Sequence, residues 1–121
     1  MNSNDENERK LKVLTVPTLK YKNAHHMPDQ IDVKTHFDIG QIIKLNYGYG
    51  QKKIYCEFQI MEIYYTMLCG ANMNMLRLKP MDKEFLELYT TDKNGCISCS
   101  EADVLRTMEN KLISGQIRRI K

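Results

Sequence analysis

Apolar residues occupy every second position from Ile54 to Ile60, and this alternation constrains the fold more than any other feature of the chain. A β-strand points successive side chains to opposite faces, so residues two apart share a face. One face collects four apolar residues: Ile54, Cys56, Phe58 and Ile60. The other face is mixed and holds Tyr55, Glu57, Gln59 and Met61. The segment is therefore predicted to be a half-buried strand with one side in the core.

Turn residues lie on both sides of this strand. The linker before it, 48–51, reads Gly-Tyr-Gly-Gln, and the linker after it, 70–72, reads Gly-Ala-Asn. Glycine and asparagine tolerate the positive φ angles of tight turns. The segments beyond these turns, 41–47 and 73–79, also carry apolar residues at alternate positions. Together they predict a three-stranded antiparallel meander, with a bulge or bend near Glu62, where the alternation slips by one residue.

Two further strands are predicted before the meander. Residues 10–22 are rich in β-branched side chains, but Pro17 lacks an N–H donor, which indicates an edge strand or two short strands split at the proline. Residues 31–37 alternate cleanly and predict another strand. The polar residues 1–9 are expected to form a flexible tail, followed by a single domain over 10–121.

After the meander, the sequence predicts a short helical turn at 81–86, a strand at 87–91 and a turn at 92–95. The clearest helix follows at 101–113, and Ser100 is placed to cap its free N–H groups. One apolar stripe at helical spacing supports this helix. It consists of Val104, Leu105, Met108 and Leu112.

These elements predict an α+β, β-rich fold. We expect a bent antiparallel sheet or a small open β-barrel of five to seven short strands, with one C-terminal helix near 101–113 across an open end. A chain of 121 residues can bury roughly two-thirds of the surface that its unfolded form exposes. Folding is therefore expected to need neither a disulfide nor a metal.

Composition narrows the setting in which the protein works. The net charge is +3, and no apolar run approaches the ~20 residues of a membrane helix. The N-terminus is polar and acidic, unlike a secretory signal. We therefore expect a cytoplasmic protein without a membrane partner, or one of the host cytoplasm or virion if a phage encodes it. Abundant Asn, Lys, Ile and Tyr without Trp suggest an AT-rich bacterial or phage genome.

Cys96 and Cys99 form a C-x-x-C motif, which is half of a typical zinc site. A structural zinc needs four ligands, and the other two cysteines, Cys56 and Cys69, lie thirteen residues apart without a second such motif. The plainer interpretation is two reduced thiols beside a helix start. Motifs of phosphate-binding loops, serine hydrolases, kinases and zinc proteases are absent from the sequence. We expect no cofactor and no enzymatic activity.

Two binding functions are consistent with the sequence. Tyrosines and lysines around one hairpin are the chemistry that single-stranded nucleic acids need for base stacking and phosphate contact. This hairpin, 44–55, carries Lys44, Tyr47, Tyr49, Lys52, Lys53 and Tyr55. Protein contact is the preferred hypothesis, because the mixed face of the long strand is more apolar than a free surface needs. Its predicted contact residues are Tyr55, Met61, Ile63 and Tyr65.

Methionines crowd the same region, and methionine adapts to irregular partner surfaces, although core filling would explain them equally well. We therefore predict a small non-catalytic binding or assembly module that acts through a protein partner or self-association, in a larger bacterial or phage assembly. The alternative is an accessory protein that binds nucleic acid through the hairpin 44–55.

Overall fold

A computed structural model of the chain describes residues 11–19, 28–48, 51–66 and 72–108. These ranges contain six strands and two helices, which confirms the predicted α+β, β-rich class. The strands are β1 (Lys12–Leu19), β2 (Gln30–Thr35), β3 (Ile42–Asn46), β4 (Tyr55–Thr66), β5 (Met73–Pro80) and β6 (Ile97–Ser100). The helices are α2 (Lys83–Leu88) and α3 (Glu101–Met108).

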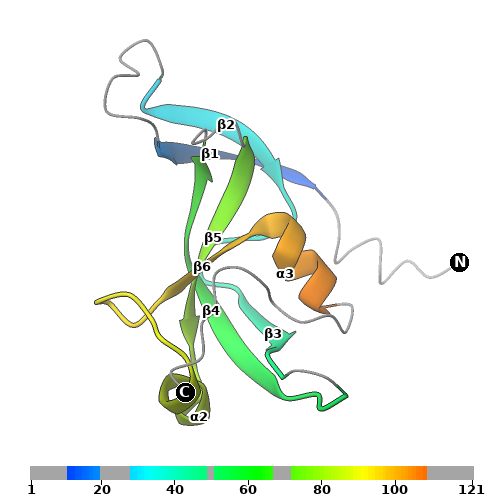
Figure 1. The fold of residues 1–121 in the computed structure, drawn as a ribbon. Coiled ribbons are helices and arrows are strands. Elements are labelled where there is room, and N and C mark those ends of the chain that lie inside the picture. The colour runs from blue at the N-terminus through cyan, green and yellow to red at the C-terminus, as the bar shows by residue number, and fades with distance from the viewer. Residues whose placement is uncertain (1–10, 20–27, 49–50, 67–71, 109–121) are drawn as a thin grey trace, which may run out of the picture.

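All six strands belong to one open sheet (Figure 1). Its order is β2-β1-β4-β5-β6, and β3 pairs with β4 as well. Four of the pairings are antiparallel, as predicted, and they include the meander β3-β4-β5. The pairing of β1 with β4 is parallel, which the sequence did not predict, so the sheet is mixed. Two parallel strands need a long connection, and the connection from β1 to β4 contains β2 and β3.

Strand β1 changes its partner directly after Pro17. Up to that residue it pairs with β2, and Thr18 and Leu19 then pair with Tyr65 and Thr66 of β4. The Thr18 N–H donates to the Asp29 carbonyl at 3.0 Å, just before β2 begins. The proline therefore marks a change of partner within one continuous strand, rather than a break between two strands.

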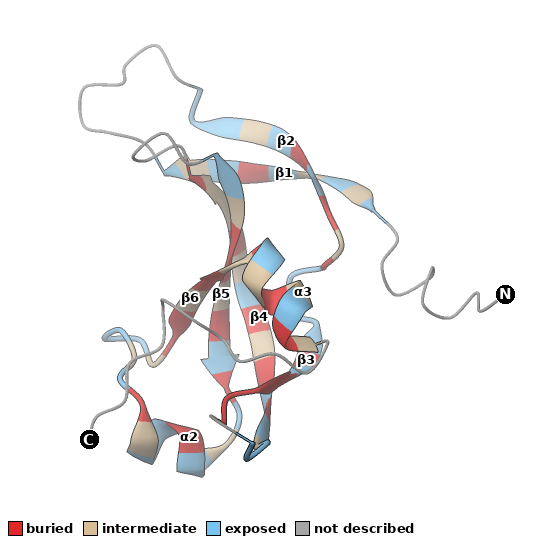
Figure 2. Ribbon diagram, turned by 45° about the vertical axis from the view of Figure 1, so that its right-hand side comes forward, coloured by how far each residue is buried: buried red, intermediate tan, exposed pale blue. Residues whose placement is uncertain are grey.

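The alternation along β4 places its side chains as predicted. Cys56, Phe58 and Ile60 are buried, and Tyr55 and Met61 on the other face are exposed (Figure 2). The predicted irregularity is confirmed, because the register of β4 against β5 shifts between Ile60 and Glu62. A bulge adds one residue and reverses the faces that follow it. Ile63 is consequently fully buried, and its prediction as an exposed contact residue is wrong.

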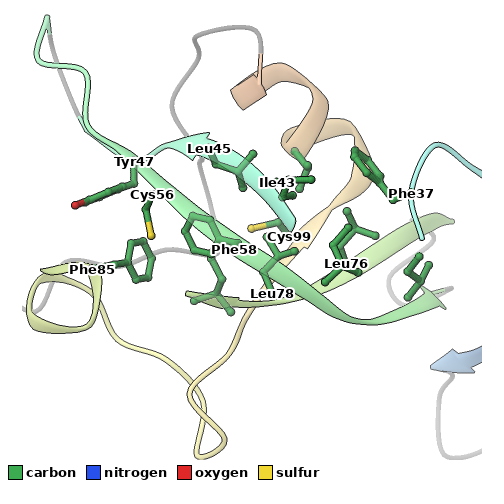
Figure 3. Close-up of a cluster of buried hydrophobic side chains, with 14 of the residues drawn as sticks. Phe37, Ile43, Leu45, Tyr47, Cys56, Phe58, Leu76, Leu78, Phe85 and Cys99 are labelled. Carbon is green, nitrogen blue, oxygen red and sulfur yellow. The ribbon is translucent and has the colours of Figure 1, made fainter. Parts of the chain in front are cut away.

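Helix α2 inserts an aromatic side chain into one end of the core. Phe85 is fully buried, with its ring centroid 5.1 Å from that of Tyr47 and 5.0 Å from that of Phe58 (Figure 3). The Tyr89 ring stacks on Phe85 at 4.8 Å, and its hydroxyl donates to the Tyr47 carbonyl at 2.7 Å. The strand predicted at 87–91 is therefore wrong, because the helix continues through Leu88 and Tyr89 packs beside it.

The turn at 92–95 is organised by Asp92. Its Oδ1 atom accepts N–H groups from Asn94 at 2.8 Å and Cys96 at 2.9 Å, and Gly95 adopts a φ of 78°. This backbone region favours glycine. The turn leads into β6, which pairs with β5 and buries Ile97 and Cys99. The sequence had indicated only a helix start in this segment.

Helix α3 begins as predicted, because the Ser100 Oγ accepts the Asp103 N–H at 3.1 Å. Val104 and Thr107 are buried under the helix, beside the inner face of the sheet. The described part of α3 ends at Met108, so the predicted extension to 113 lies outside the described residues. The predicted tail at 1–9, Tyr49 and Cys69 also lie outside them.

Candidate functional site

The strands of the meander present one exposed face opposite the core, which we call the outer face. Strand register arranges it in rows. Ile42 lies opposite Gln59, which lies opposite Lys79. Lys44 lies opposite Glu57, whose carbonyl accepts the Met81 N–H at 2.8 Å. Side chains from β3, β4 and the chain after β5 therefore share this surface.

Large apolar side chains interrupt the polar residues of the outer face. Ile42 is 52% exposed, Tyr55 41%, Met61 45% and Met81 52%. Tyr55 and Met81 also line a hollow of about 500 Å³. It is lined by Lys44, Tyr55, Cys56, Glu57, Met81, Asp82 and Lys83. Isolated exposed apolar residues are ordinary, whereas several on one sheet face make that face a candidate contact surface.

The outer face brings together only some of the predicted contact residues. Lys44 and Tyr55 line the same hollow, and Met61 is exposed further along β4. Lys52 and Lys53 are exposed in the connection between β3 and β4. Tyr65 pairs with Thr18 of β1, is half-buried and packs against the core cluster, so its predicted place beside Tyr55 and Met61 is wrong for the same reason as that of Ile63.

Tyr47 is a correction to the predicted contact set. It is 4% exposed and lies inside the aromatic cluster with Phe85 and Tyr89. Its alternation with Ile43 and Leu45 had placed it on the apolar side of β3, so packing and not surface contact explains the residue. The proposed stacking platform therefore loses one of its three tyrosines, and Tyr49 lies outside the described residues.

The charges that line the hollow balance. The hollow contains two bases, Lys44 and Lys83, and two acids, Glu57 and Asp82. A lysine directly opposite a glutamate in neighbouring strands is a favourable cross-strand pair. A nucleic-acid backbone at this hollow would meet two carboxylates, whereas a protein surface of mixed charge would be complementary.

The buried groups near the hollow are poor nucleophiles. Burial, together with the charge of Asp82, raises the pKa of the Cys56 thiol to about 11 and that of the Tyr47 hydroxyl to about 12. A thiol reacts as the thiolate, so a raised pKa makes Cys56 inert near neutral pH.

The C-x-x-C cysteines lie in and beside β6. Both are buried, and burial raises the pKa of the Cys99 thiol to about 12. Zinc binds the thiolate form, which burial in the core disfavours. Within 11–19, 28–48, 51–66 and 72–108, no three His, Cys, Asp or Glu side chains are grouped so that they could hold a metal ion.

A second hollow, of about 340 Å³, lies on the other half of the sheet. Its central side chain, Arg77, donates to Asp92 Oδ2 from Nε at 3.2 Å and from Nη2 at 2.9 Å. Glu62 lies on its other side, with Oε1 3.6 Å from Nη1. The hydrogen bonds of Asp92 with Cys96, Asn94 and Arg77 lower the pKa of its carboxyl. These groups satisfy one another and tie the 92–95 turn to β5.

A buried polar cluster around Glu101 was not predicted. One carboxylate oxygen, Oε1, accepts from the Thr35 hydroxyl at 2.6 Å and the Asn74 amide at 3.1 Å. The other, Oε2, accepts from the His36 N–H at 2.9 Å and contacts His36 Nδ1 at 2.6 Å. Glu101 is the first residue of α3, where a carboxylate also suits the positive end of the helix dipole. Its partners are 27 to 66 residues away, and no sequence pattern connects them.

None of the described helices is long and apolar enough to span a bilayer. Comparisons of the chain with protein-family models, curated protein sequences and solved structures gave no match.

Proposed function

We propose that this chain is a non-catalytic binding module that acts through protein–protein contact at the outer face of β3 and β4. The observation that supports it is the set of exposed apolar side chains on this face, namely Ile42, Tyr55, Met61 and Met81. Lysines and carboxylates of balanced charge lie among them. An apolar centre with a polar rim is the usual anatomy of a protein interface. Tyrosine and methionine are also enriched at such interfaces.

Edge geometry adds a second way for a partner to bind. The Tyr47 N–H donates to the Ile54 carbonyl, and the Gln41 carbonyl accepts the Ile60 N–H. In the segment 41–47, the odd-numbered residues therefore direct their main-chain N–H and C=O groups towards β4. The N–H and C=O groups of Ile42 and Lys44 then point to the opposite edge of β3. Strand β3 pairs with β4 alone among the described strands. A partner strand could bond to this edge and contact the outer face with its side chains.

Nucleic-acid binding through the hairpin 44–55 remains the alternative. It retains the exposed Lys52 and Lys53, but Tyr47 is buried and Lys44 lies opposite Glu57. Single-strand sites combine a positive groove with several accessible aromatic rings. The balanced charge around Tyr55 fits a protein surface better than it fits a phosphate backbone.

The test begins with self-association, measured as the mass of the full chain by analytical ultracentrifugation over a range of concentrations. If the chain is monomeric, a photo-cross-linking residue at position 55 then captures a partner in the native source. Replacement of Met61 and Ile42 by Ser should weaken self-association or capture at least about tenfold, because truncation of buried interface anchors costs 1 kcal/mol or more each. Val13→Ser is the matched control, because Val13 is 62% exposed on β1.

Two results would contradict the proposal. One is equal association or capture by the wild type and the Ile42/Met61 variant. The other is a salt-dependent shift with a single-stranded oligonucleotide that Lys52→Glu and Lys53→Glu abolish, which would support the alternative.

A further inference from the structure

Strands β1 and β2 form an arm, which we call the β1–β2 arm, that lies across one end of the remaining sheet (Figures 1 and 2). In the described residues, β2 pairs only with β1. The arm joins the sheet through two residue pairs, Thr18 with Tyr65 and Leu19 with Thr66. Because this ladder is so short, side-chain contacts provide much of the attachment of the arm to the sheet.

Glu101 provides the most extensive of these attachments. It is the first residue of α3, and its carboxylate accepts from Thr35 at the end of β2 and from His36 directly after it. Asn74 of β5 donates to the same carboxylate and also to the Lys34 carbonyl of β2, at 2.7 Å. One carboxylate therefore connects the arm, the central sheet and a helix.

In the closed arrangement, hydrogen bonds from the protein replace water around the Glu101 carboxylate. Glu101 is 7% exposed, and a buried carboxylate is tolerated when hydrogen bonds replace water. Among the described residues, His36 is the one titratable side chain in contact with it. Asp103 and Arg106 of α3 pair with each other, and Lys34 of β2 contributes its main-chain carbonyl. Asn74 of β5 is uncharged.

We propose that Glu101 is a proton-controlled latch: as a carboxylate it fastens the β1–β2 arm to α3 and β5, and its protonation releases the arm while β3 to β6 stay folded. A protonated carboxyl keeps one hydroxyl donor and loses acceptor capacity. Thr35, the His36 main chain and Asn74 all donate to this carboxylate, and all three hydrogen bonds weaken when protonation removes its negative charge. The contact with His36 Nδ1 also loses its charge assistance.

The direction of the pH effect follows from the environment of the carboxyl. Burial raises the pKa of Glu101, but hydrogen bonds from Thr35, His36 and Asn74 outweigh burial and hold that pKa below its ordinary value of 4.5. A released arm exposes Glu101 and restores the ordinary pKa. The latch therefore contributes fully above pH 4.5 and is lost as the pH falls through the lowered pKa.

Release of the arm leaves most of the core in place. The arm contributes Val16 and Val33 to the buried cluster. The larger part of that cluster comes from β3, β4, β5 and the two helices (Figure 3). It includes Leu45, Phe58, Ile60, Leu76, Leu78, Phe85 and Val104. Local opening below the free energy of global unfolding is common for such peripheral units.

Hydrogen exchange of the full chain, followed by mass spectrometry from pH 7 to pH 3 and corrected for intrinsic rates, tests the latch. At pH 7, Glu101→Gln should increase opening of the β2 amides at least about tenfold, because a hydrogen bond to a charged group is lost, and leave β4 and β5 unchanged. Wild-type β2 should open below pH 4.5, and the variant should lose this pH dependence. Asp38→Asn is the control, since Asp38 is an exposed carboxylate paired with Lys12 at 2.5 Å.

Three results would overturn the latch. The first is exchange of β2 and β4 with the same protection at every pH, which means that the arm has no separate opening. The second is an equal effect of Asp38→Asn. The third is unchanged exchange of the β2 amides in Asn74→Ala. If Glu101→Gln fails to fold, the pH titration of the wild type and the exchange of Asn74→Ala still test the latch.

Discussion

Replacement of Phe85 by Ala should destabilise the protein more than any change to an exposed residue of the same helix. Phe85 has no exposed surface and is the one buried residue of α2. Phe→Ala substitutions in cores cost about 3–5 kcal/mol in the free energy of unfolding. The Phe85 ring also contacts Tyr47, Phe58 and Tyr89, and each aromatic pair adds roughly 0.5–1.5 kcal/mol beyond burial.

The expected cost of Phe85→Ala is therefore about 4–5 kcal/mol, near the top of the range. A helix of six residues cannot persist in water without its packing, so α2 should detach when this anchor is lost. With a urea m-value of about 2 kcal/mol/M, the unfolding midpoint should fall by about 2 M. Phe85→Leu retains most of the apolar volume and should cost about 1–1.5 kcal/mol.

Urea unfolding followed by circular dichroism measures these differences. Leu86→Ala is the matched control, because Leu86 is the next residue of α2 and is 45% exposed. Its cost should stay within about 0.5 kcal/mol. A cost for Phe85→Ala below about 1.5 kcal/mol, or equal to that of Leu86→Ala, would refute the packing of α2 on the aromatic cluster.

Two further outcomes follow from the packing of the sheet. Gly48→Ala should lower the free energy of unfolding in urea by about 1–3 kcal/mol. An added Cβ would overlap the Lys52 carbonyl oxygen and lie 2.9 Å from the Ile54 nitrogen. An unchanged urea midpoint would contradict this contact. Cys56 and Cys99 should react with a thiol reagent at pH 8 at least about 100-fold more slowly in the native protein than in urea. The reason is that burial raises their pKa values to about 11 and about 12. Rapid labelling of these two thiols in the native protein would contradict their burial.

Sequence periodicity predicted the faces of β4 because a strand repeats every two residues and one face is buried. It also located the bulge near Glu62, since the alternation visibly slips there. Ile63 was predicted on the wrong face, because the alternation of the residues before the bulge was extended to the residues after it. Tyr47 was assigned correctly to the apolar side of β3, but a tyrosine near lysines on a hairpin resembles a surface contact until its packing on Phe85 is known.

Other features could not be predicted from local patterns. Strand β6 has four residues, and the alternation of Ile97 and Cys99 with two serines was its one signal in the sequence. Its C-x-x-C motif had suggested either half of a zinc site or two reduced thiols beside a helix start. The Glu101 cluster depends on Thr35 and Asn74, which reach the carboxylate only after the sheet has brought distant segments together. Tertiary contacts of this kind leave no trace in the spacing of residues.

The parallel join between β1 and β4 also implies an order of folding events. Hairpins such as β4–β5 connect neighbouring segments and close short loops, whereas Thr18 meets Tyr65 only after the intervening chain has folded back. Closure of a longer loop costs more entropy, and non-local pairings slow folding. We therefore expect the meander to form early and Thr18 and Leu19 to dock in a late step. Until then, the β4 edge at Tyr65 and Thr66 would stay open to a neighbouring chain.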